Sequence, residues 1–177
     1  MIAAAAAVAQ RMRLVALVGG HGSGRRTLAR HMERTHGFER VALEAPLRRA
    51  ATEIFGLQQE VFDSAAKEAA ACGPERCTSA RALLLCTRQA GAAFRGSDGF
   101  LAELAERDLR ARLRAGALLV VEDVATREEA DVLARLGGEL WRVGDGAPAW
   151  IQQLEHVPVC THQPLAHTLE DVDVLLL

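Results

Sequence analysis

Short apolar runs alternate along this chain with longer segments in which apolar residues recur every three or four positions. Apolar residues concentrated at 14–18, 117–123 and 139–145 predict buried strands, and FERVALEA at 38–45 predicts another short one. Helical periodicity predicts helices over 27–34, 46–55, 81–94, 100–114 and 128–136. The closing stretch DVDVLLL at 171–177 predicts the last strand.

The order of these elements decides the fold class. Strands that alternate with helices form a parallel sheet with right-handed crossovers, so we expect a three-layer α/β/α domain with a mainly parallel sheet over residues 14–177. The alanine-rich residues 1–13 are expected to form a flexible extension. Residues 57–79 show no clear period and contain the turn signal CGPE, which predicts a mobile segment or lid over a site.

Composition and charge exclude several classes of protein. The net charge of -2 and the pI near 6.3 disfavour a protein that coats nucleic acid, because acids balance the arginines along the chain. No stretch approaches the roughly 20 apolar residues of a membrane span, so we expect no membrane partner. Small anionic ligands fit this composition, and a homodimer stays open.

The four cysteines indicate a reducing compartment. Their spacing matches no zinc signature, and no signal peptide is recognisable. A metal site is disfavoured for the same reason, although one could in principle be built from Cys72, Cys77, His162 and His167. We therefore expect ordinary thiols, Cys86 and Cys160 included, and a cytoplasmic location.

One loop carries the strongest chemical signal. After the apolar run at 14–18 the chain continues as GGHGSGRRTL. Its glycines let successive N–H groups point at one phosphate, and the N-terminus of the next helix adds its dipole. The residues expected to hold nucleotide phosphates are Gly19, Gly22, Ser23, Gly24, Arg25, Arg26 and Thr27, with the Thr27 hydroxyl also a Mg²⁺ ligand. The alternative is a strand-to-helix connection that only needs tight packing.

Arg25 stands where phosphate-binding loops carry lysine. The chain contains a single lysine, Lys67, so arginine replaces lysine almost everywhere and Arg25 can reflect composition. A guanidinium is nevertheless larger than an ammonium, planar and forked, so the exchange is not conservative at a tight site. Binding of phosphate is therefore expected to tolerate the exchange better than transfer does.

A second signal lies at the end of the run at 117–123. An apolar strand that ends in Asp123 resembles a Walker B element, whose carboxylate holds Mg²⁺ across from the phosphate loop. Glu122 precedes it, and strand alternation is expected to point the two carboxylates to opposite faces. Acids at strand ends are common, so the assignment depends on the glycine loop beside it.

Three further blocks resemble the phage-type deoxynucleoside monophosphate kinases. ALEAPLRRAATEIFGL at 42–57 is similar to that family's Pro-Leu-Lys block and the helix after it. VVEDVATREEADVLARLGGELWRV at 120–143 resembles its Asp-Val-Arg block, and THQPLAHTLEDVDVLLL at 161–177 resembles its closing segment. The blocks come in the family's order and, with the glycine loop, cover the chain from residue 14 to its end.

The resemblance implies a P-loop nucleoside/nucleotide kinase that transfers the γ-phosphoryl group of ATP, with Mg²⁺, to a (deoxy)nucleoside monophosphate. Carried over position by position, the residues that would contact the acceptor are Arg48, Lys67, Arg81 and Arg88, and 57–79 would be the acceptor-side or lid segment. The catalytic groups would be Arg25, Asp123 and Arg127, with Asp123 and Thr27 holding the metal. Basic groups suit the task, because phosphoryl transfer is largely positioning and charge neutralisation.

Departures from the family's pattern keep two other functions open. The arginine of the Asp-Val-Arg block is Ala125 here, the acid that follows the loop's lysine is Arg26, and the final helix is missing because the chain ends on its last predicted strand. One alternative is a non-catalytic descendant that binds a nucleotide or a partner protein. The other is a kinase of another small phosphorylated acceptor such as phosphomevalonate, because the animal-type phosphomevalonate kinases share much of this pattern.

Overall fold

The computed structural model describes residues 13–62, 79–161 and 165–176. The chain divides into two compact units, each described by itself below. The first comprises residues up to Leu43 together with Leu101–Leu177, and the second comprises Glu44–Phe100. Within the described ranges, no helix combines the length and the apolar character that crossing a membrane requires.

The first unit is built on a five-stranded sheet. Its strands are β1 (Leu14–Gly19), β2 (Glu39–Val41), β3 (Leu119–Val124), β4 (Glu139–Val143) and β5 (Val157–Val159). They lie in the order β2-β3-β1-β4-β5, and every neighbouring pair is parallel. β1 is buried along its whole length because it is the central strand, covered on both faces.

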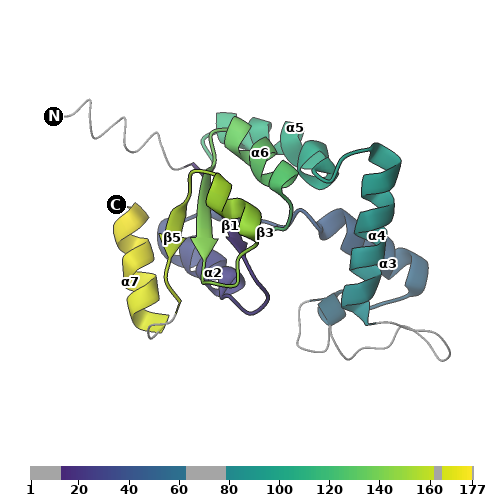
Figure 1. Cartoon of the computed structure of the whole chain (residues 1–177), viewed down its shortest axis with the longest axis horizontal. Helices are drawn as coiled ribbons and strands as arrows, with labels where there is room; N and C mark the ends of the chain where they lie inside the picture. The colour runs from purple at the N-terminus through teal and green to yellow at the C-terminus, as the bar shows by residue number, and fades with distance from the viewer. Residues whose placement is uncertain (1–12, 63–78, 162–164, 177) are drawn as a thin grey trace. The chain divides into compact units, whose positions relative to one another are not determined.

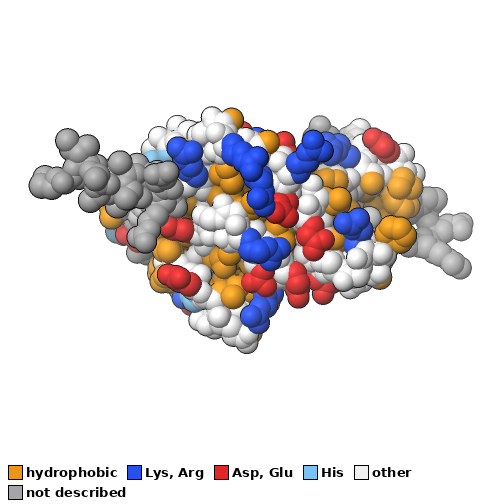
Figure 2. All heavy atoms as spheres, turned by 90° about the horizontal axis from the view of Figure 1, so that it is seen from above, with side chains coloured by type: hydrophobic (Ala, Val, Ile, Leu, Met, Phe, Trp, Pro, Cys, Tyr) orange, Lys and Arg blue, Asp and Glu red, His pale blue; other side chains and the backbone are white. Residues whose placement is uncertain are grey.

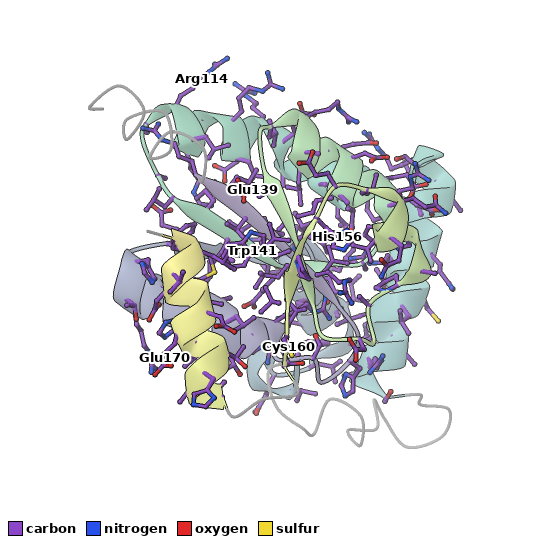
Figure 3. The ribbon with its side chains drawn as sticks, turned by 60° about the vertical axis from the view of Figure 1, so that its left-hand side comes forward. Arg114, Glu139, Trp141, His156, Cys160 and Glu170 are labelled. Atoms are coloured by element: carbon purple, nitrogen blue, oxygen red, sulfur yellow. The ribbon has the colours of Figure 1, made fainter. Side chains whose placement is uncertain are left out.

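Helices cover both faces of this sheet, which confirms the three-layer α/β/α class. α2 (Arg25–His36) and α7 (Leu165–Leu176) lie side by side on one face (Figure 1). Figure 3 labels Trp141 in the interior beneath them, and Glu170 on the outward side of α7. The core of this face consists of Val15, Leu17, Leu28, Ala29, Met32, Phe38, Val120, Trp141, Val143, Val159 and Val172. On the other face α6 (Arg127–Arg135) packs against β1 and β4, with α5 (Phe100–Arg114) beside it (Figure 1).

The second unit is helical. It contains α3 (Ala45–Phe55), the 3-10 helix η1 (Gln59–Phe62) and α4 (Ala80–Arg95), which pack on one another. Its buried apolar side chains include Leu47, Ala51 and Leu84, and the fully buried Phe62. Ser79 caps α4, since its hydroxyl accepts a hydrogen bond from the N–H of Ala82 at 3.3 Å.

The surface carries both signs of charge. On α5, Arg110 pairs with Glu106 and Arg112 with Asp108, one helical turn apart in each case. In Figure 2 basic and acidic side chains lie next to one another at several places on the face shown. Such pairs contribute little to stability because they are largely exposed to water.

The predicted strand at 171–177 is wrong, because these residues belong to helix α7 up to Leu176. Val172 is fully buried whereas Val174 is 71% exposed, and a strand would place both on one face. The buried and half-buried positions of α7 are Thr168, Leu169, Val172, Asp173, Leu175 and Leu176, which is the spacing of one helical stripe. The segment predicted as the closing strand is therefore a helix. The last strand is β5, which the sequence analysis missed.

The other elements occur where the sequence predicts them, with shifted ends. α5 has the predicted bounds, and α3, α4 and α6 differ from theirs by one or two residues. α2 is longer than the predicted 27–34 and begins at Arg25, directly after the last glycine of the loop. The short helix η3 (Ala149–Gln153) was not predicted, and most of the predicted mobile segment lies outside the described residues.

Candidate functional site

The glycine loop connects the central strand β1 to α2 at the carboxyl edge of the sheet, where parallel sheets bind ligands. Gly22 and Gly24 have φ values of 74° and 93°, a left-handed conformation that disfavours residues with a Cβ. Between them the chain turns back, and the Ser23 N–H donates to the Gly20 oxygen at 3.3 Å. Gly24 then caps α2, accepting the first helical hydrogen bond from Leu28 at 3.0 Å.

Gly19 and Gly20, the first two glycines of the loop, leave no room for a Cβ atom. A Cβ on Gly19 would lie 2.6 Å from the Val143 carbonyl oxygen and 2.5 Å from the Ser23 hydroxyl. A Cβ on Gly20 would lie 2.3 Å from the Gly146 carbonyl oxygen. The loop is therefore pressed against the backbone that follows β4, a wall formed by residues 143–146. Residues 143–146 were not among the predicted site residues, although the glycines on either side of Asp145 are a turn signal.

The N-terminus of α2 has the features of an anion site. Its first N–H groups have no carbonyl one turn earlier to bond to, and Gly24 has no side chain that could cap them. Arg25 and Arg26 are its first two residues, and the first turn contains no acid. Among the described residues, the buried Ser23 hydroxyl also has no hydrogen-bond partner. A phosphate oxygen would satisfy these donors, so the loop fits the group that the sequence predicts.

The structure brings Arg25 and the end of β3 together. Arg25 Nη1 donates to the carbonyl oxygen of Val124 at 3.3 Å, and Val124 directly follows Asp123. Asp123 Oδ1 accepts the Leu43 N–H at 2.9 Å, which anchors the chain after β2. The register of β3 against β1 shifts here, since Ala16 pairs with Val121 but Val18 pairs with Val124. This irregularity places both acids opposite Leu17 and re-aims their side chains.

Glu122 and Asp123 have different partners. The buried Glu122 carboxylate accepts two hydrogen bonds at 3.0 Å, from Nε and Nη2 of Arg40 on β2. That pairing raises the pKa of Arg40, and Glu33 of α2 lies 3.7 Å from the same guanidinium. Glu122 therefore belongs to the structural tie between β2 and β3.

Arg127 lies at the first position of α6. Its Nη1 donates to Gln153 Oε1 at 2.8 Å, its Nε is 4.0 Å from Asp131, and its side chain is 46% exposed. The start of this helix is fixed by a capping box, in which the Thr126 hydroxyl accepts the Glu129 N–H and the Glu129 carboxylate accepts the Thr126 N–H. A direct role of Arg127 with phosphate would require it to leave these partners.

The residues predicted to contact the acceptor belong to the second unit. Arg48 on α3 and Arg88 on α4 are buried, and both approach Glu44, at 3.5 and 3.6 Å. Arg81 lies in the first turn of α4 and is half-buried. Lys67 lies outside the described residues. The structure thus groups two of the four predicted arginine and lysine side chains around one carboxylate.

The cysteine prediction can be followed only in part. Cys86 and Cys160 are exposed free thiols. Cys72, Cys77 and His162, which the disfavoured metal site would need, lie outside the described residues.

Comparisons with known proteins give two weak structural likenesses and no sequence match. No protein-family model matches the chain, and no curated protein matches it significantly. A cysteine-to-alanine mutant of the APS kinase CysC from Mycobacterium tuberculosis aligns with a TM-score of 0.48 at 18% identity, over 94% of this chain and 97% of that one. An unliganded sugar kinase from Janibacter sp. aligns with a TM-score of 0.45 at 18% identity, over 93% and 94%. The assignment to an α/β/α fold with a phosphate-type loop therefore rests on the strand order and the loop geometry of this chain.

Proposed function

We propose that this chain is an ATP-dependent kinase of a (deoxy)nucleoside monophosphate. The observation that carries the proposal is the glycine loop, which ends at the start of α2, where no side chain caps the helix and Arg25 is hydrogen-bonded beside Asp123. The same chain segment supplies backbone donors and a guanidinium, and the adjacent strand supplies a carboxylate. A transferring phosphoryl group needs these same groups around it.

The individual roles follow from position. The N–H groups from Gly22 to Thr27 and the Ser23 hydroxyl would hold the phosphates of ATP, with Arg25 neutralising charge where the bond breaks. Asp123 and Thr27 would hold Mg²⁺, which neutralises phosphate charge when bound. The buried Arg48 and Arg88, with Arg81, would recognise the acceptor's phosphate, as the family resemblance implies.

A catalytically impaired descendant that binds nucleotide is the second candidate, and a specific observation favours it. In the general loop pattern the residue after lysine carries the hydroxyl that ligates Mg²⁺. Here that residue is Arg26, and Thr27 follows it with an exposed side chain. With Ala125 in place of the family's arginine, binding is easier to support than transfer.

Two measurements separate these candidates. Calorimetric titration and thermal unfolding with MgATP test binding, and we expect a saturable rise in unfolding temperature. A coupled assay with MgATP tests transfer. Its acceptors are a panel of deoxynucleoside monophosphates and, separately, phosphomevalonate. Binding of MgATP without turnover of any acceptor supports the catalytically impaired descendant. Turnover of phosphomevalonate alone supports a kinase of another small phosphorylated acceptor. Absence of MgATP binding would contradict both kinase functions and the nucleotide-binding descendant.

The Asp123→Asn variant tests the metal assignment. It removes a charge without changing volume, so we expect the fold to persist and the Mg²⁺-dependent part of ATP binding to disappear. Glu122→Gln is the matched control, because it alters the neighbouring acid at the Arg40 tie. Normal MgATP binding by Asp123→Asn would show that this carboxylate is not the ligand.

A further inference from the structure

Three side chains that the proposed function does not use converge at the other end of α2. His31 and His36 on α2 and Asp173 on α7 place their ligand atoms within 4.8 Å of one another. The Nε2 atoms of His31 and His36 lie 2.6 and 2.7 Å from the same oxygen, Asp173 Oδ1. Positions 31 and 36 are about 140° apart around a helix, so the two rings approach the carboxylate from different sides.

The cluster is open enough for an ion to enter. Both imidazoles are 19% exposed and the carboxylate is 38% exposed, so the ligand atoms are ordered by their packing but reachable from water. The two rings meet edge to face, with centroids 6.0 Å apart and planes at 70°. Without metal, the Nε2 atoms of both rings make hydrogen bonds with Asp173 Oδ1. With the ring protons on Nδ1, an ion bound between the three side chains would accept both Nε2 lone pairs and replace these hydrogen bonds.

Charge favours a cation at this place. Two neutral imidazoles and one carboxylate carry a net charge of about -1, so a divalent ion leaves a net charge of about +1. His36 is the last residue of α2, where the helix dipole stabilises positive charge. The N-terminal end of the same helix carries the glycine loop, where the dipole favours an anion.

The ligand set selects the kind of ion. Imidazole nitrogens with one carboxylate suit Zn²⁺ and its borderline neighbours Co²⁺ and Ni²⁺, whereas Mg²⁺ and Ca²⁺ prefer oxygen ligands. In a tetrahedral zinc site, bonds of about 2.0–2.1 Å separate neighbouring ligand atoms by about 3.3 Å. The present 2.6 and 2.7 Å contacts would have to widen by about 0.6 Å, which small side-chain rotations supply.

The geometry points to a binding site for a zinc-like divalent cation formed by His31, His36 and Asp173, with water in the remaining coordination position. Bound there, the ion would join α2 to the C-terminal helix α7. Because the ion binds the folded chain, it would stabilise the fold by mass action. Neither the nucleotide site nor the acceptor residues are needed for this inference.

Thermal unfolding and calorimetric titration of the full, tag-free chain, stripped of metal with EDTA, test the site with ZnCl₂. We expect one ion per chain and a rise in unfolding temperature of about 5–10 °C at one hundred times the Kd. His31→Ala, His36→Ala and Asp173→Asn should each lower the affinity at least about tenfold. A response in His31→Ala and His36→Ala equal to that of the wild type would overturn the assignment, and so would the absence of saturable binding by the wild-type chain.

Two controls keep the test decisive. His167→Ala removes an exposed histidine from the same helix α7 and should leave zinc binding unchanged. The absorption spectrum of the Co²⁺-loaded wild-type chain shows the coordination geometry and whether thiolates bind the ion. It needs no substitution, so it remains informative if a variant fails to fold. Tetrahedral d–d bands without a thiolate charge-transfer band support the site, and a strong thiolate band shows that cysteines hold the ion instead.

Discussion

The two ends of helix α2 suit opposite charges and use different parts of the chain to do so. At the N-terminal end, the candidate anion site is made mainly of backbone, because glycines and N–H groups without a side-chain cap form it. At the C-terminal end, the candidate cation site is made of side chains from His31, His36 and Asp173. The helix dipole favours each charge at its own end.

The two ends of α2 are therefore expected to be sensitive to different kinds of substitution. A backbone site tolerates exchanges of side-chain type, which is how the loop can keep its shape with Arg25 in place of lysine. It does not tolerate a change in the path of the chain. A side-chain site behaves in the reverse way, because each missing ligand costs affinity while the helix stays intact. Substitutions at one end should therefore leave the other unchanged.

The largest expected effect is that of Gly20→Ala. The new Cβ would lie 2.3 Å from the Gly146 carbonyl oxygen, so the loop or the wall at residues 143–146 must move. Overpacking of this kind costs about 1–3 kcal/mol of folding free energy, and the displaced loop should no longer bind MgATP. Thermal unfolding with and without MgATP measures both effects. Zinc binding at the other end of α2 should survive in this variant.

Gly146→Ala is the matched control, since it adds a methyl group to the other side of the same contact. There the Cβ would meet only the Gly20 Cα, at an ordinary 3.8 Å, so stability and MgATP binding should match the wild type. Equal losses in Gly20→Ala and Gly146→Ala would mean that the packing between loop and wall does not hold the phosphate loop in shape.

The second-largest expected effect is that of substitutions at Arg25, which act through the side chain. Arg25→Ala removes the guanidinium that reaches Val124, and in an active kinase the loss of one such donor lowers turnover about 100-fold. Arg25→Lys puts a compact charge at the same place. If the chain is an active kinase in which arginine merely replaced lysine, this variant should turn over faster than the wild type. In an impaired descendant both variants stay at background in the coupled assay. Unchanged turnover of an active protein after Arg25→Ala would show that this side chain does not touch phosphate.

The contrast between the two ends of α2 also explains what the sequence could predict. The residues of the N-terminal end are contiguous from Gly19 to Thr27, and a glycine-rich turn between a strand and a helix has a known physical use. The structure has that turn, and it brings Arg25 to the end of β3. The roles of these residues with ATP and Mg²⁺ stay predictions.

The C-terminal end could not be predicted because its parts are 142 and 137 positions apart. Asp173 was also assigned to a strand, since DVDVLLL alternates polar and apolar residues over a short window. A window that starts at Leu165 shows the helical stripe of Thr168, Val172 and Leu176 instead. The short strand β5 was not predicted because its sequence VPV contains proline, which argues against a strand. The proline is tolerated because β5 lies at the edge of the sheet.

The smallest expected effect concerns pH and the contact of α2 with α7 in the absence of metal. Hydrogen bonds from His36 and His31 hold the pKa of the Asp173 carboxyl below its ordinary 3.8. A carboxyl whose pKa is lower in the folded chain stabilises the fold at every pH above the unfolded value. That contribution is lost as the pH falls through the lower, folded value.

Asp173→Asn isolates this effect, because the amide keeps the shape of the side chain and does not titrate. With EDTA present, the wild type should be more stable than Asp173→Asn at pH 5, and the difference in unfolding free energy should shrink as the pH falls below 3.8. Urea unfolding at a series of pH values measures it, and the exposed position of the carboxylate keeps the difference small. A difference that stays constant to the lowest pH at which the chain folds would mean that the two histidines do not stabilise the ionised carboxylate.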